Sequence, residues 1–223
     1  MDKLVKTKEL YHCSVPYLSP LFEECEYPWE MLPKIKELAK KLIEIGIDGY
    51  TLYAEGVLVG ENVKIYPTAT IEGPTVIGSG TEVRPGAFIR GSALVGDNCV
   101  VGNSTELKNV ILFDNVQVPH YNYVGDSILG FKSHMGAGSI TSNVKSDKTP
   151  VVIKTQDKSE SFYTERKKVG AMLGDFVEIG CGSVLNPGTV VGREASVYPL
   201  SSVRGIVPEG HIYKANGNIV KRV

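Results

Sequence analysis

The sequence predicts a mainly β protein, a single-stranded parallel β-helix of six-residue repeats. Two stretches of its 223 residues place an aliphatic side chain at every sixth position, and a small or β-branched residue stands two positions before each. This period matches neither an α-helix, at about 3.6 residues per turn, nor a lone strand, at about two. It matches short strands joined by corners, whose stacked coils share one core. The aliphatic positions are Val59, Ile65, Ile71, Ile77, Val83, Ile89, Val95, Val101 and Leu107, then Leu173, Ile179, Leu185, Val191, Val197 and Val203. A β-sandwich is excluded, because the turn clusters that it needs every ~8–12 residues are absent.

The segments around the repeat define the expected organisation of the chain. Residues 1–56 carry no repeat, and Pro28 to Ile45 read as an amphipathic helix that ends at Gly46. We expect this segment to be a cap over the first coil, because terminal repeats need covering. The β-helix is expected over 57–206, with an inserted loop or hairpin at about 144–168, where the repeat breaks into a polar, lysine-rich stretch. Residues 207–223 are expected to form a C-terminal tail.

Composition limits the partners and the compartment. The net charge is −1 and there is no long basic run, which argues against nucleic acid as the main partner. No stretch approaches the roughly 18 apolar residues of a membrane span, and the N-terminus lacks the apolar core of a signal peptide. The four cysteines lie far apart without a Cys-x-x-Cys pair, so we expect free thiols. A cytoplasmic protein that does not enter a membrane is the expectation.

The densest group of reactive side chains runs from His120 to Asn143. It contains two of the four histidines, His120 and His134, together with two tyrosines and a glycine-rich turn, and it directly precedes the expected insertion. A lone histidine is usually structural or solvated. Here His120 lies at a break of the repeat, which favours a functional role.

Three motifs carry a resemblance to a known family. They are His120-Tyr121-Asn122-Tyr123-Val124-Gly125-Asp126, the block Gly136 to Asn143, and Arg84-Pro85-Gly86-Ala87 upstream. With them, residues 57–215 resemble the acetyltransferase half of bacterial bifunctional N-acetylglucosamine-1-phosphate uridyltransferase/glucosamine-1-phosphate acetyltransferases. They resemble even more closely the C-terminal domain of archaeal-type sugar-1-phosphate nucleotidylyltransferases. The nucleotidyltransferase domain of those families has no counterpart in the short segment 1–56 before the repeat, so we expect no nucleotidyltransferase activity from this chain.

The resemblance implies an acetyl-CoA-dependent N-acetyltransferase that acts on an amino-sugar phosphate or a nucleotide-linked amino sugar. It implies that His120 is the general base, which takes a proton from the attacking amine. Arg84 and Lys108 are then expected to bind the sugar phosphate. Tyr123 is expected to line the sugar pocket, and Asn143 to orient the sugar or the base.

The resemblance also implies a coenzyme site and an assembly. Backbone at Ala137 and Cys181 is expected to face the thioester of acetyl-CoA, where a backbone N–H stabilises the oxyanion. Lys148 is expected to reach a partner subunit's site, and Arg166 and Lys167 to meet coenzyme phosphates. His134 stands where the bacterial family usually has asparagine in the acceptor pocket. The family's β-helices are left-handed and pack as homotrimers with active sites between subunits, so a homotrimer is expected.

Two alternatives stay open and a third is set aside. In the first, the same base takes a proton from a hydroxyl group of the acceptor, and the protein is an O-acetyltransferase. A non-catalytic sugar-nucleotide-binding or assembly module keeps the same motifs without turnover. A γ-type carbonic anhydrase needs three histidine ligands, whereas only His120 and His134 lie near each other in the sequence.

Overall fold

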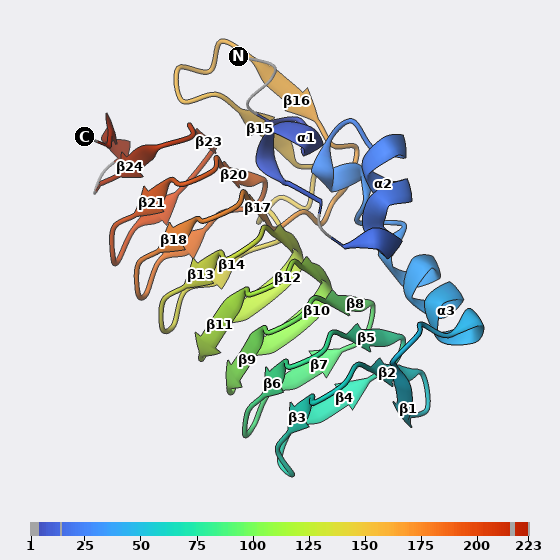
Figure 1. The fold of residues 1–223 in the computed structure, drawn as a ribbon. Helices are drawn as coiled ribbons and strands as arrows, with labels where there is room; N and C mark the ends of the chain where they lie inside the picture. The colour runs from blue at the N-terminus through green and yellow to red at the C-terminus, as the bar shows by residue number, and fades with distance from the viewer. Residues whose placement is uncertain (1–4, 14, 215–216, 223) are drawn as a thin grey trace.

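The structure, a computed structural model, describes residues 5–13, 15–214 and 217–222. Short parallel strands stack into rows that form the sides of a left-handed β-helix (Figure 1), which confirms the predicted fold. The first row holds β2 (Val57–Val59), β5 (Thr75–Ile77), β8 (Ala93–Val95), β17 (Ala171–Leu173), β20 (Thr189–Val191) and β23 (Ile206–Val207). The second row holds β3 (Lys64–Ile65), β6 (Glu82–Val83), β9 (Val100–Asn103), β11 (Gln117–His120), β13 (His134–Met135), β18 (Glu178–Ile179), β21 (Ser196–Val197) and β24 (His211–Tyr213). The third row holds β4 (Thr70–Glu72), β7 (Phe88–Arg90), β14 (Ile140–Thr141), β19 (Val184–Leu185) and β22 (Ser202–Val203).

Two longer strands, β10 (Glu106–Leu112) and β12 (Tyr123–Leu129), bend round a corner and belong to both the third and the first rows. Their corners are single residues, Asn109 and Asp126, with φ of 54° and 48°. Short polar side chains such as these tolerate the left-handed backbone conformation. As a result, the coil from Ala93 to its partner Val110 is shorter, by a single residue, than the coil from Thr75 to its partner Ala93. This shortening explains why the regular spacing of six ends at Leu107 in the first stretch.

The aliphatic positions of the repeat point into the core. Nearly all of them are buried, and each fully buried aliphatic side chain contributes about 1.5–3 kcal/mol. Ile65 and Ile71, in the first coil, are only half-buried. The first coil is therefore the least covered part of the core.

The N-terminal segment runs along the side of the β-helix, so the expected cap over the first coil is wrong (Figure 1). Its main helix, α3 (Ile35–Ile45), packs against β5, β8 and β10. The cause lies in the first row, whose outward side chains are aliphatic as well as its inward ones: Val76, Leu94 and Ile111 are at most 1% exposed. These residues need an apolar cover more than the end of the stack does, and the buried stripe of α3 supplies it.

The helix predicted from Pro28 begins seven residues later. Pro28–Glu30 form a 3₁₀ turn, η3, and α3 starts only at Ile35. Pro33 explains the break, because proline has no N–H for the preceding turn and its ring clashes with that turn. The end is as predicted: Gly46 has φ of 75° and its N–H donates to the Leu42 carbonyl. The shorter elements upstream are α1 (Thr7–Leu10), η2 (Pro16–Leu18) and α2 (Ser19–Glu24).

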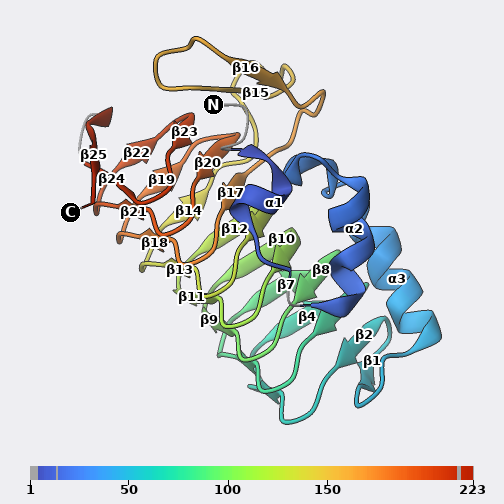
Figure 2. The same ribbon diagram turned by 45° about the horizontal axis from the view of Figure 1, so that its top comes forward.

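The insertion after Asn143 contains a β-hairpin of β15 (Val152–Lys154) and β16 (Ser161–Tyr163), and a bridge between Val144 and Lys168 closes its base. The hairpin lies beside the N-terminal helices (Figure 2). Its Phe162 ring packs against Tyr27 and Trp29, with ring centroids 5.9 and 6.4 Å apart. The hairpin and the N-terminal segment thus support each other.

Both ends of the expected β-helix need correction. Before it, β1 (Thr51–Ala54) pairs antiparallel with β2, so the sheet starts ahead of residue 57. After it, β24 pairs parallel with β21 and then antiparallel with β25 (Ile219–Lys221), so the coil continues past 206 into the expected tail. Residues 1–4 of the expected cap, its Ser14, and 215–216 and 223 of the expected tail lie outside the described residues. No helix in the described part of the chain is long and apolar enough to span a bilayer.

Candidate active site

One corner of the β-helix, between the second and third rows, carries His120. We call it the histidine corner and define it by Asn103, His120, Ala137 and Cys181, which stack in successive coils, together with Arg84, which stands one residue before this position in the coil that precedes Asn103. Backbone bonds link the later coils: Gly138 N–H donates to the His120 carbonyl at 3.0 Å, and Gly182 N–H to that of Ala137 at 2.9 Å. Strands in neighbouring coils lie about 4.8 Å apart, so Arg84 and Cys181 each stand roughly 10 Å from His120 along the axis.

The imidazole of His120 is exposed, and among the described residues it makes no hydrogen bond or ion pair. The backbone beneath it is fixed by Asn122, which is 2% exposed. Its Oδ1 accepts from His120 N–H at 3.1 Å, and its Nδ2 donates to the carbonyls of Gly136 and Ser139 at 2.9 and 3.0 Å. Asn122 therefore ties the histidine to the glycine-rich turn of the next coil, while the ring stays available to a ligand.

A second group lies at the corner between the third and first rows. We call it the aspartate corner and define it by Lys108, Asn109, Asp126, Asn143 and the nearby Tyr123. The Asp126 side chain is 5% exposed and accepts from Asn109 Nδ2 at 2.9 Å and from Asn143 Nδ2 at 2.6 Å. Lys108 Nζ lies 3.7 Å from the carboxylate. The single-residue corners stack these side chains directly above one another.

Tyr123 lies between the two corners, on the third row. Its hydroxyl accepts from Asn143 Nδ2 at 3.2 Å. The ring lies over Gly125, where a Cβ would come within 2.5 Å of the hydroxyl oxygen. Burial raises the pKa of Tyr123, and the negative charges of Asp126 and Glu106 raise it further. The phenol therefore stays neutral and able to donate a hydrogen bond at physiological pH.

The structure brings the predicted residues together in two groups. The first group lies at the histidine corner and consists of Arg84, His120, Ala137 and Cys181. The second group lies at the aspartate corner and consists of Lys108, Tyr123 and Asn143. The arm of β12 between the corners, residues 123–125, is roughly 10 Å long at about 3.3 Å per residue. A single chain therefore does not place His120 beside Asn143.

The remaining predicted residues lie elsewhere. His134 is on the second row, where its Nδ1 lies 2.9 Å from Glu178 Oε2. Lys148, Arg166 and Lys167 belong to the insertion. Lys148 is in a turn with φ of 55°, and Arg166 Nε is buried with no hydrogen-bond partner among the described atoms. Arg84 forms an ion pair with Glu82 at 3.2 Å.

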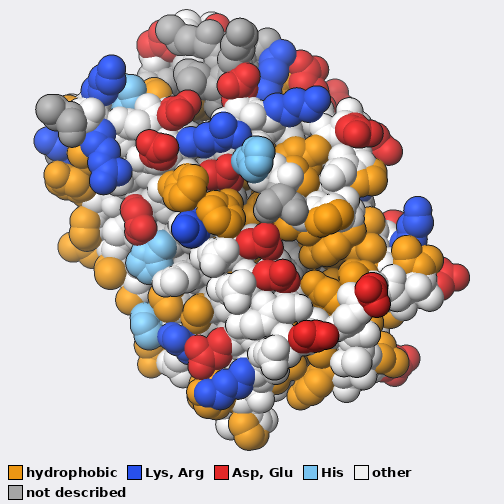
Figure 3. All heavy atoms as spheres, in the orientation of Figure 1, with side chains coloured by type: hydrophobic (Ala, Val, Ile, Leu, Met, Phe, Trp, Pro, Cys, Tyr) orange, Lys and Arg blue, Asp and Glu red, His pale blue; other side chains and the backbone are white. Residues whose placement is uncertain are grey.

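Sequence reasoning assigned no role to Asn122 and Asp126, although both lie inside the quoted motif. Their importance follows from side-chain hydrogen bonds to residues of the next coil, from Asn122 to Gly136 and from Asn143 to Asp126. Within the ranges that the structure describes, no three His, Cys, Asp or Glu side chains are arranged to hold a metal ion. In Figure 3, charged and histidine side chains are scattered over the coils, and apolar side chains gather beside the N-terminal helices.

Fold and site together define a hexapeptide-repeat β-helix with polar groups at two neighbouring corners. Residues 71–205 match the family described as the GMPPB C-terminal domain. The chain belongs to this family.

Curated relatives confirm the resemblance that the motifs suggested. The chain is 30% identical over 226 residues to the "Bifunctional protein GlmU" of Methanococcus maripaludis (strain DSM 14266), a match that covers 100% of this chain and 54% of the relative. It is 32% identical over 114 residues to the "Bifunctional sugar-1-phosphate nucleotidylyltransferase/acetyltransferase" of Sulfurisphaera tokodaii, covering 51% and 28%. The chain thus spans about half the length, or less, of these relatives.

A solved structure has the same fold. The UDP-N-acetylglucosamine acyltransferase from Campylobacter jejuni superimposes with a TM-score of 0.52 at 16% identity, over 75% of this chain and 71% of that one. At this identity the likeness concerns the architecture of the coils.

Proposed function

We propose that this protein is an acyltransferase that moves an acetyl group from acetyl-CoA to the amino group of a sugar phosphate or nucleotide-linked sugar. The observation that carries the proposal is the exposed imidazole of His120, which has no partner among the described residues, while its backbone N–H donates to Asn122 and its carbonyl accepts from Gly138. Histidine is the side chain most often used as a base near neutral pH. The names of the bifunctional relatives and the fold of the acyltransferase support the same reaction.

In this mechanism His120 accepts a proton as the amine nitrogen attacks the thioester carbonyl. The tetrahedral intermediate then collapses, the C–S bond breaks, and the thiolate of coenzyme A leaves and takes up a proton. The turn around Ala137 and the backbone at Cys181 lie along the axis from His120, and there backbone N–H groups stabilise the oxyanion.

The acceptor is held by the charged and polar groups at the two corners. Lys108 and Arg84 supply positive charge for a phosphate, as a point charge and as a planar fork. Tyr123 and Asn143 supply a neutral hydroxyl and an amide for the sugar. Because Asp126 already fixes Asn143, this part of the site is formed before the acceptor binds.

We further propose that the working form is a homotrimer, in which the histidine corner of one chain meets the aspartate corner of its neighbour. Two observations support it. The predicted residues divide between corners roughly 10 Å or more apart in one chain. The histidine corner also exposes large apolar side chains, Tyr121 at 64% and Leu200 at 85%. A closed ring buries such a repeated face.

Removing the base tests the activity. His120→Ala is expected to lower kcat for coenzyme A release with glucosamine-1-phosphate by about 10²–10⁴, the usual effect of losing a general base. The matched control is His211→Ala, which removes another partly exposed histidine far along the coil and is expected to keep wild-type kcat. Unchanged turnover in His120→Ala contradicts the proposed base. A parallel assay with hydroxyl acceptors in place of the amine distinguishes O-acetylation.

Mixing two inactive chains tests the shared site. We expect His120→Ala and Lys108→Ala each to be inactive alone, because each lacks one half of every site. Refolded together, they form mixed trimers in which some sites combine an intact His120 with an intact Lys108 from the neighbour, so a fraction of the activity returns. The measurement is coenzyme A release before and after joint refolding, with sedimentation to establish the assembly. If joint refolding restores nothing while a trimer forms, each site lies within one chain.

A further inference from the structure

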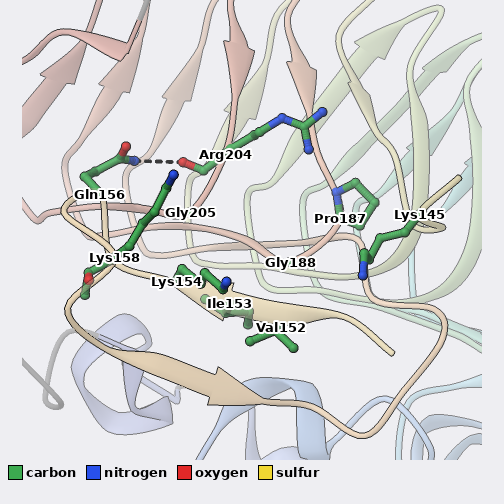
Figure 4. A pocket seen from close by; sticks show the side chains of 11 residues that line it. Lys145, Val152, Ile153, Lys154, Gln156, Lys158, Pro187, Gly188, Arg204 and Gly205 are labelled. Carbon is green, nitrogen blue, oxygen red and sulfur yellow. Dashed lines mark hydrogen bonds between the residues drawn. The ribbon is translucent and has the colours of Figure 1, made fainter. Parts of the chain in front are cut away.

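A cavity of about 270 Å³ lies between the hairpin and a corner of the later coils, away from the histidine corner (Figure 4). The coils contribute Pro187-Gly188 and Arg204-Gly205, which precede β20 and β23. The hairpin contributes β15 with the turn that follows it, and Lys145 closes one side. None of the roles assigned above uses this cavity.

The hairpin packs closely against this corner. Gly188 and Gly205 have φ of 78° and 73°, and a Cβ would meet the Val151 side chain at 2.6 Å in one case and the Lys154 carbonyl at 2.5 Å in the other. Gln156 Nε2 donates to the carbonyls of Arg204 and Ile206 at 2.7 and 3.2 Å. These contacts fix the position of the hairpin relative to the two coils that line the cavity.

The cavity is positively charged. Four cations line it, Lys145, Lys154, Lys158 and Arg204, and no lining residue is acidic. Lys145 is paired with Asp147 at 3.3 Å. The other three make no ion pair with any described residue. The nearby Asp157 is bound by Thr155 and Ser159 and does not line the cavity.

We propose that this cavity binds the diphosphate group of a ligand. Three positive charges that pair with no described residue exceed the two negative charges of a diphosphate diester, and in Figure 4 the amino group of Lys158 reaches toward Gly205 while the guanidinium of Arg204 extends toward Pro187. Guanidinium groups bind phosphate oxygens through paired hydrogen bonds, and lysine adds a point charge. The volume is small beside the roughly 300–1,000 Å³ of a site that encloses a whole organic ligand, so the rest of the molecule extends outside.

The proposal goes beyond acetyl transfer, since the cavity lies in later coils along the corner between the third and first rows and the proposal makes no use of His120. A diphosphate occurs both in coenzyme A and in nucleotide-linked sugars. The chemistry recognised is the same for the two sources, and competition between them identifies the occupant.

The test is calorimetric titration of the full chain with inorganic pyrophosphate at low salt. We expect saturable binding that the double variant Lys158→Gln/Arg204→Gln weakens at least about tenfold, since it removes two positively charged hydrogen-bond donors to the phosphate oxygens. The matched control is Lys36→Gln/Lys41→Gln, which removes two exposed charges from α3 and is expected to bind as the wild type does. Equal affinity in the two double variants, or no saturable binding by the wild type, overturns the proposal.

Competition then identifies the ligand. Displacement of pyrophosphate by coenzyme A assigns the site to the coenzyme, and displacement by UDP assigns it to a nucleotide sugar. If neither displaces it, a diphosphate ester is not the occupant and the proposal fails. A loss of turnover in His120→Ala leaves all of these titrations unchanged, so this proposal and the acetyltransferase proposal fail separately.

Discussion

The two polar corners are built in opposite ways. At the histidine corner a buried amide, Asn122, fixes the backbone and leaves the His120 ring without a partner among the described residues. At the aspartate corner a buried carboxylate, Asp126, fixes the side chains of Asn109 and Asn143 directly. The first arrangement suits a group that must exchange a proton with a ligand. The second suits groups that must keep a fixed position before the ligand arrives.

The comparison predicts a large difference in stability. Asp126→Ala leaves two half-buried amides without their acceptor and removes the partner of Lys108, so we expect the free energy of unfolding to fall by about 2 kcal/mol. His120→Ala removes an exposed ring and is expected to change it by less than about 0.5 kcal/mol. Urea titration followed by circular dichroism measures both. A loss below about 1 kcal/mol in Asp126→Ala means that solvent or rearrangement satisfies the amides, and the contrast between the corners is then wrong.

The smallest expected effect is the response of Tyr123 to alkaline pH. Its pKa in the folded chain is raised above 10.0 by burial and by nearby carboxylates. As the pH rises above 10, the unfolded chain loses this proton first, so the folded state loses stability until the pH passes the raised pKa. In Tyr123→Phe the free energy of unfolding is expected to fall less steeply as the pH rises above 10. Tyr163→Phe, whose residue is 74% exposed, is the control and is expected to keep the wild-type slope. Equal slopes in the two variants contradict a half-buried Tyr123 whose pKa is raised.

The β-helix could be predicted from the sequence because the aliphatic residue at every sixth position is a local pattern that recurs in each coil. Each coil places its inward side chain at a fixed spacing, so Ile77, Val95 and Val191 could be assigned to the core before their neighbours were known. The lateral course of α3 was missed, although the runs Val57-Leu58-Val59 and Thr75-Val76-Ile77 carry an apolar residue on the outward side too. An apolar residue on the outward side, between two inward-facing ones, indicates a strand that is covered on both faces.

The site was predictable residue by residue but not in its arrangement. Motifs placed His120, Tyr123 and Asn143 in one short segment, and the fold separates the first from the last by an arm of β12. The roles of Asn122 and Asp126 depend on which residues stack above them. That stacking follows from shortened coils, which arise where single-residue corners replace longer ones. A periodicity of six does not reveal such a change of register.

The N-terminal residues are held by coils that are made much later in translation. His12 N–H donates to Asp175 Oδ2 at 2.8 Å, and Arg193 reaches the Lys8 carbonyl at 3.1 Å, across 163 and 185 residues of chain. In the nascent chain α3 can pack on β5, β8 and β10 early, but the residues around Lys8 and His12 have no docking partner until Asp175 and Arg193 have been made. Contacts so distant in sequence slow folding and prolong the exposure of apolar surface. Synthesis of this protein therefore includes an interval in which most coils and α3 exist while the segment before α2 is still undocked.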